Sequence, residues 1–161
     1  MATCAAVRPL QLLLVEDNPG DVRLTKEAFK AGEVNVSLNV VRDGVEAIDF
    51  LRQRGAFKSA RLPDLILLDL NLPLRSGREV LSEIKADPNL KKIPVLVMTT
   101  SQADQDIDCA YSLNANCYIT KPIDLDDFLR IVKSIGEFWL KTVTLPTVQA
   151  PTTMVAQKSG F

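Results

Sequence analysis

Five residues with reactive or charged side chains each lie at the end of a short apolar run. They are Glu16 and Asp17 after LLLV, Asp69 after LILL, Thr99 after VLVM, and Lys121 after CYIT. A carboxylate can act as a nucleophile toward phosphorus, while an ammonium group and a hydroxyl can hold the charged phosphoryl oxygens. Three acids, a hydroxyl and a lysine at equivalent positions therefore predict a phosphoryl-transfer site.

The apolar runs themselves have the pattern of buried strands. Each is short, and most are apolar throughout, as in parallel strands covered by helices on both faces. We expect strands at 11–15, 37–41, 65–68, 95–98 and 117–120, with a helical pattern after each. Alternating strands and helices predict an α/β fold with a parallel sheet. In the strand order 2-1-3-4-5, the first and third strands are neighbours, so Glu16, Asp17 and Asp69 would share one crevice.

Helix-start signals support this register. Asn18 before Pro19 reads as a cap with proline at the first helical position. Two capping boxes and two further starts with an early acid follow along the chain: Asp43-x-x-Glu46, Ser76-x-x-Glu79, Ser101-x-x-Asp104 and Asp124-x-x-Asp127.

Carboxylates packed this closely repel one another unless a cation lies among them. Oxygen ligands without Cys or His favour Mg²⁺, which binds one or two carboxylates together with water and substrate phosphate. We therefore expect Glu16, Asp17 and Asp69 to bind Mg²⁺, with the backbone carbonyl of Asn71 as a further ligand. Asp69 would be the nucleophile, and Lys121 and Thr99 would contact the phosphoryl oxygens.

Composition excludes several other classes of function. The 161-residue chain has a formal net charge of -1 and contains no histidine. The near-neutral charge gives no general attraction to nucleic acid or to an anionic membrane, and the lack of imidazole excludes histidine bases, histidine metal ligands and a phosphohistidine on this chain. The three cysteines lack metal or redox spacing, and residues 1–10 form no signal or anchor, so we expect a cytoplasmic protein.

Four segments resemble the receiver domain of two-component response regulators, in its single-domain, chemotaxis-type form. They are Leu14–Asn18, Pro63–Pro73, Pro94–Thr99 and Tyr118–Pro122. The resemblance implies a flavodoxin-like (βα)5 fold with Asp69 as phosphoacceptor, Glu16 and Asp17 as the acidic pair and Lys121 as the phosphate-binding lysine. It also implies that Tyr118 is the switch aromatic and that the Lys121–Pro122 peptide bond is cis. Such a protein accepts a phosphoryl group from a histidine kinase and loses it slowly by hydrolysis, as a switch rather than a turnover enzyme.

A narrower resemblance is to regulators that partner bacterial phytochrome histidine kinases, especially cyanobacterial ones. It rests on Asn18–Asp21, on the long loop before Pro63, on Gly77–Leu81 and on Phe138–Leu140. It implies a phytochrome-type kinase as partner. The chain departs from the wider family at Leu74–Ser76, where Met and Asp are frequent, and this departure concerns recognition rather than chemistry.

The chain ends suggest a division into an extension (1–9), a receiver domain (10–140) and a tail (141–161). In the last helix, a stripe of apolar residues suffices to face its own sheet. Ile131, Phe138, Trp139 and Leu140 widen that stripe, which predicts a homodimer interface. The alternative is that Trp139 folds back over its own domain. A tail of this length is too short for a DNA-binding module, so we expect signalling through protein contacts and no DNA binding.

Other readings of the same residues are weaker. Asp69-Leu70-Asn71 lacks the glycine of a calcium-binding loop. A flavin or nucleotide binder needs a phosphate-cradling loop where Glu16 and Asp17 stand, and a haloacid-dehalogenase-like phosphatase needs its Asp-x-Asp after the first strand. A phosphorylation-independent scaffold with the receiver fold remains as the alternative of another class, and labelling by acetyl phosphate distinguishes it.

Overall fold

In the computed structural model, which describes residues 8–121 and 124–146, five parallel strands form one sheet in the order β2-β1-β3-β4-β5. The strands are β1 (Leu10–Val15), β2 (Val36–Val41), β3 (Leu65–Leu68), β4 (Val95–Thr99) and β5 (Cys117–Thr120). The expected strands and strand order are thus confirmed, with β1, β2 and β4 one residue longer. The Lys121–Pro122 bond, expected to be cis, includes Pro122, which lies outside the described residues.

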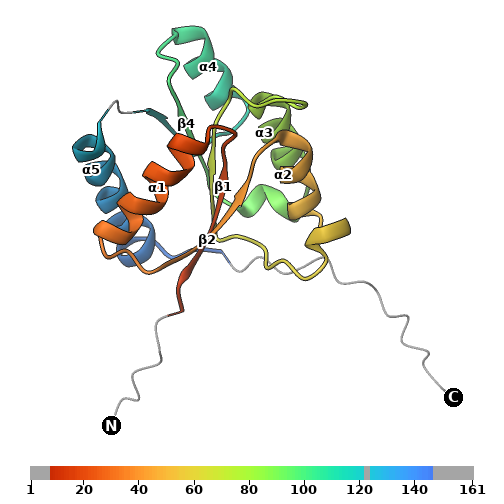
Figure 1. Cartoon of the computed structure of the whole chain (residues 1–161). Coiled ribbons are helices and arrows are strands. Elements are labelled where there is room, and N and C mark those ends of the chain that lie inside the picture. The colour runs from red at the N-terminus through yellow and green to blue at the C-terminus, as the bar shows by residue number, and fades with distance from the viewer. Residues whose placement is uncertain (1–7, 122–123, 147–161) are drawn as a thin grey trace, which may run out of the picture.

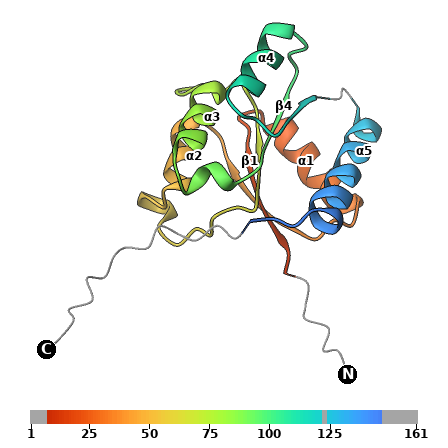
Figure 2. The same ribbon diagram turned by 180° about the vertical axis from the view of Figure 1, so that it is seen from behind.

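Helices follow the strands and cover both faces of the sheet. They are α1 (Pro19–Ala31), α2 (Gly44–Leu51), α3 (Gly77–Ala86), α4 (Asp104–Ser112) and α5 (Leu125–Gly136), with single turns at Gly55–Phe57 and Leu90–Lys92 and a π-helical segment at Glu137–Thr142. Figures 1 and 2 show α1 and α5 on one side of the sheet and α2 and α3 on the other.

The alternation of side chains along each strand produces two apolar layers. On β1, Leu13 and Val15 pack with α2 and α3, whereas Leu12 and Leu14 pack with α1 and α5. The central strands β1, β3 and β4 are buried along their whole length, and β5 at the edge is half-buried. Continuous apolar runs are therefore required in the centre, because both faces of each strand are covered.

The helix starts follow most of the expected caps. Asn18 accepts from the amides of Gly20 and Asp21, Ser76 and Glu79 form a complete capping box, and Asp124 accepts from the Asp127 amide. The early acid expected for α4 is confirmed, because Asp104 is in the first turn, and Ala103 occupies the cap position. The Ser101 hydroxyl donates to Asp106 in the same first turn at 2.5 Å.

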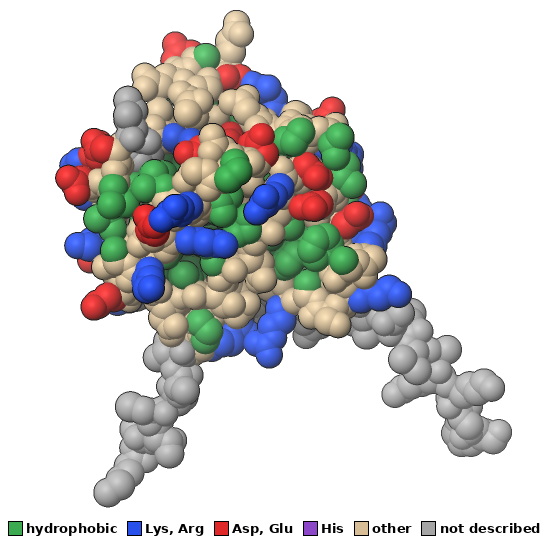
Figure 3. All heavy atoms as spheres, in the orientation of Figure 1, with side chains coloured by type: hydrophobic (Ala, Val, Ile, Leu, Met, Phe, Trp, Pro, Cys, Tyr) green, Lys and Arg blue, Asp and Glu red, His purple; other side chains and the backbone are tan. Residues whose placement is uncertain are grey.

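The C-terminal end of the described chain continues past α5 along the same apolar layer. Trp139, Leu140 and Leu145 are partly buried against the layer formed with α1 and α5. The boundary between domain and tail at residue 140 stays a prediction, and residues 147–161 lie outside the description. Over residues 8–121 and 124–146, no helix has both the length and the hydrophobicity to cross a bilayer. On the face in Figure 3, basic and acidic side chains are interspersed, in keeping with the small net charge.

Candidate functional site

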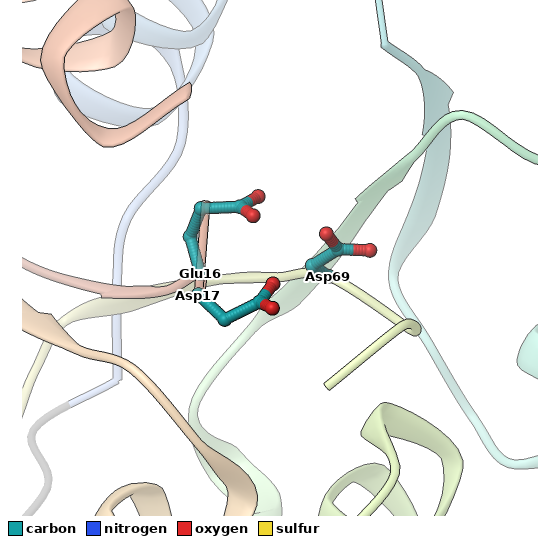
Figure 4. Close-up of side chains that lie close together, drawn as sticks. All are labelled: Glu16, Asp17 and Asp69. Carbon is teal, nitrogen blue, oxygen red and sulfur yellow. The ribbon is translucent and has the colours of Figure 1, made fainter. Parts of the chain in front are cut away.

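Three acidic side chains meet where β1 and β3 end. Val15 and Leu68 are register partners, so the residues that follow them emerge side by side. The carboxylates of Glu16, Asp17 and Asp69 each contribute an oxygen, and these oxygens all lie within 4.8 Å of one another (Figure 4). Glu16 and Asp69 are buried, whereas Asp17 is exposed. The predicted convergence of the acids is thus present in the structure.

Lys121 supplies positive charge to this cluster. Its Nζ lies 2.5 Å from Glu16 Oε2 and 2.9 Å from Asp69 Oδ2. The Lys121 amide donates to the Thr99 carbonyl, which aligns the end of β5 with the end of β4. Burial lowers the pKa of the Lys121 ammonium, but hydrogen bonds to its carboxylate partners raise it by more, so its pKa lies above the usual value.

The electrostatics of Glu16 reflect its burial. Burial raises the pKa of the Glu16 carboxyl to about 7; the hydrogen bond from Lys121 offsets part of that rise, and the charge of Asp69 adds to it. Burial removes the solvent that would stabilise the negative charge of Glu16. A cation bound beside the carboxylate would stabilise that charge instead.

Asp21 is a member of the site that sequence reasoning missed. Its Oδ2 lies 2.9 Å from Lys121 Nζ, and its side chain is one-third exposed. In the sequence, Asp21 is explained fully as an acid in the first turn of a helix capped by Asn18. Its second role depends on how the start of α1 packs in the folded domain, which brings Asp21 to Lys121.

Thr99 presents a buried hydroxyl without a partner. The residue is fully buried at the end of β4, and its Oγ1 has no hydrogen-bond partner among the described residues. A buried hydroxyl normally forms a hydrogen bond, because leaving it unpaired costs free energy. An unpaired donor next to an acid and lysine cluster suits an anionic group that arrives from outside.

Asn71 and Tyr118 lie around this centre in different ways. The backbone amide of Asn71 donates a hydrogen bond to Asp69 Oδ1 at 3.1 Å, and this bond orients the Asp69 carboxylate. The half-buried Tyr118 donates its hydroxyl to the Ser101 carbonyl at 2.9 Å. Ser101 in turn contacts Asp106, which forms an ion pair with Arg78 of α3. Tyr118 is therefore tied to the loop that follows Thr99.

The residues expected at a dimer interface lie away from the acidic cluster. Ile131, Trp139 and Leu140 are partly buried against their own domain, while Phe138 is 49% exposed. The Phe138 and Trp139 rings pack edge to face with centroids 5.3 Å apart. Trp139 thus folds back in part, as the alternative reading held, and the interface itself stays a prediction.

The acidic cluster fits a hard divalent cation. Its donors are carboxylate oxygens, with no sulfur or imidazole among the described residues that could form the cluster. Such donors favour Mg²⁺, Ca²⁺ or Mn²⁺ over softer metals. The geometry therefore combines a cation site, a carboxylate in contact with an ammonium group and an unpaired hydroxyl at one edge of the sheet.

Comparison with known proteins identifies the family to which this fold and site belong. Residues 12–133 match the family model described as the response regulator receiver domain. The chain is 49% identical to the response regulator Rcp1 of Synechocystis sp. over 138 residues, which cover 86% of this chain and 94% of Rcp1.

Two solved structures share the fold closely. That of the phosphorylated cyanobacterial phytochrome response regulator RcpA has a TM-score of 0.82 and 53% identity, covering 86% of this chain and 99% of RcpA. That of the Mn²⁺-bound form of Rcp1 has a TM-score of 0.80 and 49% identity, covering 86% of this chain and all of that one. The family model matches residues 12–133, and the relatives match most of the length of this chain. The chain therefore belongs to the response regulator receiver domain family.

Proposed function

We propose that this protein is a switch that accepts a phosphoryl group on Asp69 from the phosphohistidine of a partner histidine kinase. The observation that carries the proposal is the contact of 2.9 Å between Asp69 Oδ2 and Lys121 Nζ, in a crevice that holds two further acids. A buried carboxylate in contact with an ammonium group is positioned to attack phosphorus while the developing charge is neutralised.

The transfer balances without any further reactant. An oxygen of Asp69 forms a bond to phosphorus, and the bond between phosphorus and the imidazole nitrogen breaks. The electron pair of that bond stays on the nitrogen, which takes up a proton from solvent. Hydrolysis of the aspartyl phosphate later returns the carboxylate and releases phosphate, slowly enough for the phosphorylated form to act as a signal.

Glu16, Asp17, Asp69 and the carbonyl of Asn71 would hold Mg²⁺. When bound, the ion neutralises charge on the phosphoryl oxygens in the transition state. The relative Rcp1 has been crystallised with Mn²⁺, and the oxygen donors of this chain suit the harder Mg²⁺.

The response to phosphorylation would begin at Thr99. Its unpaired hydroxyl gains a partner only when a phosphoryl group is present, which is the differential contact that a population shift requires. Movement of Thr99 would displace the loop that holds Ser101 and so release Tyr118 from its hydrogen bond. The effect would reach α4, β5 and α5, whose surfaces would carry the signal to other proteins.

The partner that we propose is a bacterial phytochrome with kinase activity, in the cytoplasm, without DNA binding by this chain. Support comes from RcpA, which is a phytochrome response regulator at 53% identity. The output would pass through protein contacts, including a homodimer formed with Ile131, Phe138, Trp139 and Leu140.

Asp69→Asn should abolish labelling by acetyl phosphate in the presence of Mg²⁺, because it removes the nucleophile and keeps the shape. Incorporation of labelled phosphate, followed by intact-mass spectrometry, measures this. Asp64→Asn is the matched control, since Asp64 lies before β3 and pairs with Arg8. Labelling of the Asp69 variant at the wild-type level would refute the assignment.

Asp17→Asn should weaken Mg²⁺ binding by about tenfold or more, because one of the few charged ligands is lost. Calorimetric titration of the unphosphorylated protein measures the affinity. Asp108→Asn makes the same change of charge at an exposed position on α4 and should leave the affinity unchanged. Equal affinities in the two variants would remove Asp17 from the metal site.

Thr99→Val should leave the free energy of unfolding unchanged or raise it by up to about 1 kcal/mol, because it removes a hydroxyl that has no partner. Thr25→Val should lower it by about 1 kcal/mol, since the Thr25 hydroxyl donates to the Asp21 carbonyl at 2.7 Å. Urea unfolding measures both.

Thr99→Val should also accept phosphate, but with smaller amide chemical-shift changes in residues 100–106. Wild-type shift changes would contradict the role given to Thr99.

Phe138→Ser should weaken the homodimer by about tenfold or more, because it removes an apolar side chain that an interface would bury. Sedimentation equilibrium across micromolar concentrations measures the association. Val45→Thr, at an exposed position on α2, should leave it unchanged. A wild-type chain that remains monomeric at high micromolar concentration, phosphorylated or not, would exclude the interface.

A further inference from the structure

Leu74 is an apolar side chain that the fold leaves in solvent. It is 80% exposed, whereas the other exposed large apolar residues among the described positions reach at most 49%. Leu74 lies in the loop between β3 and α3, which directly follows Asp69. A single exposed leucine is ordinary on a protein surface, so its backbone and its location decide whether it has a role.

The backbone at Leu74 is strained. Its φ is 66°, in the left-handed region that residues other than glycine seldom adopt. The Arg75 amide donates to the Pro73 carbonyl at 2.8 Å, which closes a three-residue turn around Leu74. A γ-turn with positive φ is rare, and glycine or asparagine would adopt this backbone at less cost.

The surrounding structure holds this strained turn in place. Gly44 packs so closely that a Cβ there would lie 2.3 Å from the Arg75 carbonyl oxygen. The Arg75 guanidinium pairs with Glu83 of α3 at 2.6 Å, and Glu83 also binds Arg52 at 3.0 Å. Strain persists only where neighbours over-determine it. These contacts fix the turn, and with it the outward direction of Leu74.

Both ends of this loop lie close to Asp69, the proposed phosphoacceptor. The Gly77 amide donates to the Leu70 carbonyl, and a Cβ on Gly77 would lie 2.2 Å from the Asp69 carbonyl oxygen. The α carbon of Leu74 is therefore at most about 11 Å from that of Gly77, which touches Asp69. In Figures 1 and 2 the loop projects outward beside α3.

A protein that docks over Asp69 to deliver a phosphoryl group lies within reach of this loop. The chain contains no histidine, so a phosphohistidine has to come from another molecule. A protein interface of standard size covers about 800 Å² on each partner, which corresponds to a disc of about 16 Å radius. Centred on Asp69, such a disc extends over the loop that carries Leu74.

We infer that Leu74 is an anchor contact for the phosphodonor protein, which receives it in an apolar depression beside its phosphohistidine. The inference rests on the proposed function and adds a recognition element to it. Because the strained turn keeps the side chain extended before the partner arrives, little conformational freedom is lost on binding. Leu74 would act on recognition of the donor and not on the chemistry at Asp69.

The test compares a protein donor with a small one. An autophosphorylated phytochrome histidine kinase that labels the wild-type chain is mixed with Leu74→Asn, which tolerates the left-handed backbone but removes the apolar side chain. Transfer at subsaturating concentration should fall about tenfold. Leu74→Met restores an apolar side chain and should transfer within about twofold of wild type.

We expect acetyl phosphate to label all of these variants as it labels the wild-type chain, because a small phosphodonor needs no docking surface. Failure of the wild-type chain to accept acetyl phosphate would overturn the proposed function itself. Normal transfer from the kinase to Leu74→Asn, or an equal loss with acetyl phosphate, would overturn the role of Leu74 and leave the phosphoacceptor assignment intact.

Discussion

The contact of the Lys121 ammonium with the carboxylates of Glu16, Asp21 and Asp69 is the interaction on which the rest of this structure depends. Glu16 and Asp69 are buried with Asp17 beside them, and such a group is unfavourable without a compensating cation. Lys121 provides it from the end of β5, on the far side of β4. The sheet must therefore be complete before the acids are compensated. The negative charge that would attract a metal ion is thus already gathered in this fold, next to the Lys121 ammonium that would contact a phosphoryl group.

The arrangement of the β4–α4 segment explains how a local event can spread. Thr99 ends the strand, Tyr118 binds the backbone of Ser101, and the Ser101 hydroxyl contacts Asp106. Asp106 also pairs with Arg78 of α3. One loop thus joins the unpaired hydroxyl to an edge strand and to two helices. Displacement of this loop changes several contacts at once, which is how small shifts become discrete changes of state.

The sheet could be predicted from the sequence because its rules are local. Buried strands need apolar runs, and each helix needs a cap, so the segments and the residues that follow them can be read from the chain. Asp21 could not be assigned, because an acid in a first helical turn has a sufficient local explanation. The hydrogen bond from the Ser101 hydroxyl to Asp106 also had no signal in the sequence. The exposure of Leu74 depends on the approach of Gly44 to Arg75, a tertiary contact that no local pattern encodes.

Strand β1 contributes alternate side chains to both apolar layers, pairs with β2 along its whole length and pairs with β3 from Leu12 to Val15. Removing it from the fold would separate the two layers, so β1 opens only when the whole domain opens. Glu16 and Asp17 continue directly from this strand. The acidic cluster is accordingly attached to a central, buried strand, whereas Ser101 in the loop beyond Thr99 is held by polar contacts with Tyr118 and Asp106. The carboxylates that end β1 and β3 would therefore keep their positions if the segment beyond β4 were displaced.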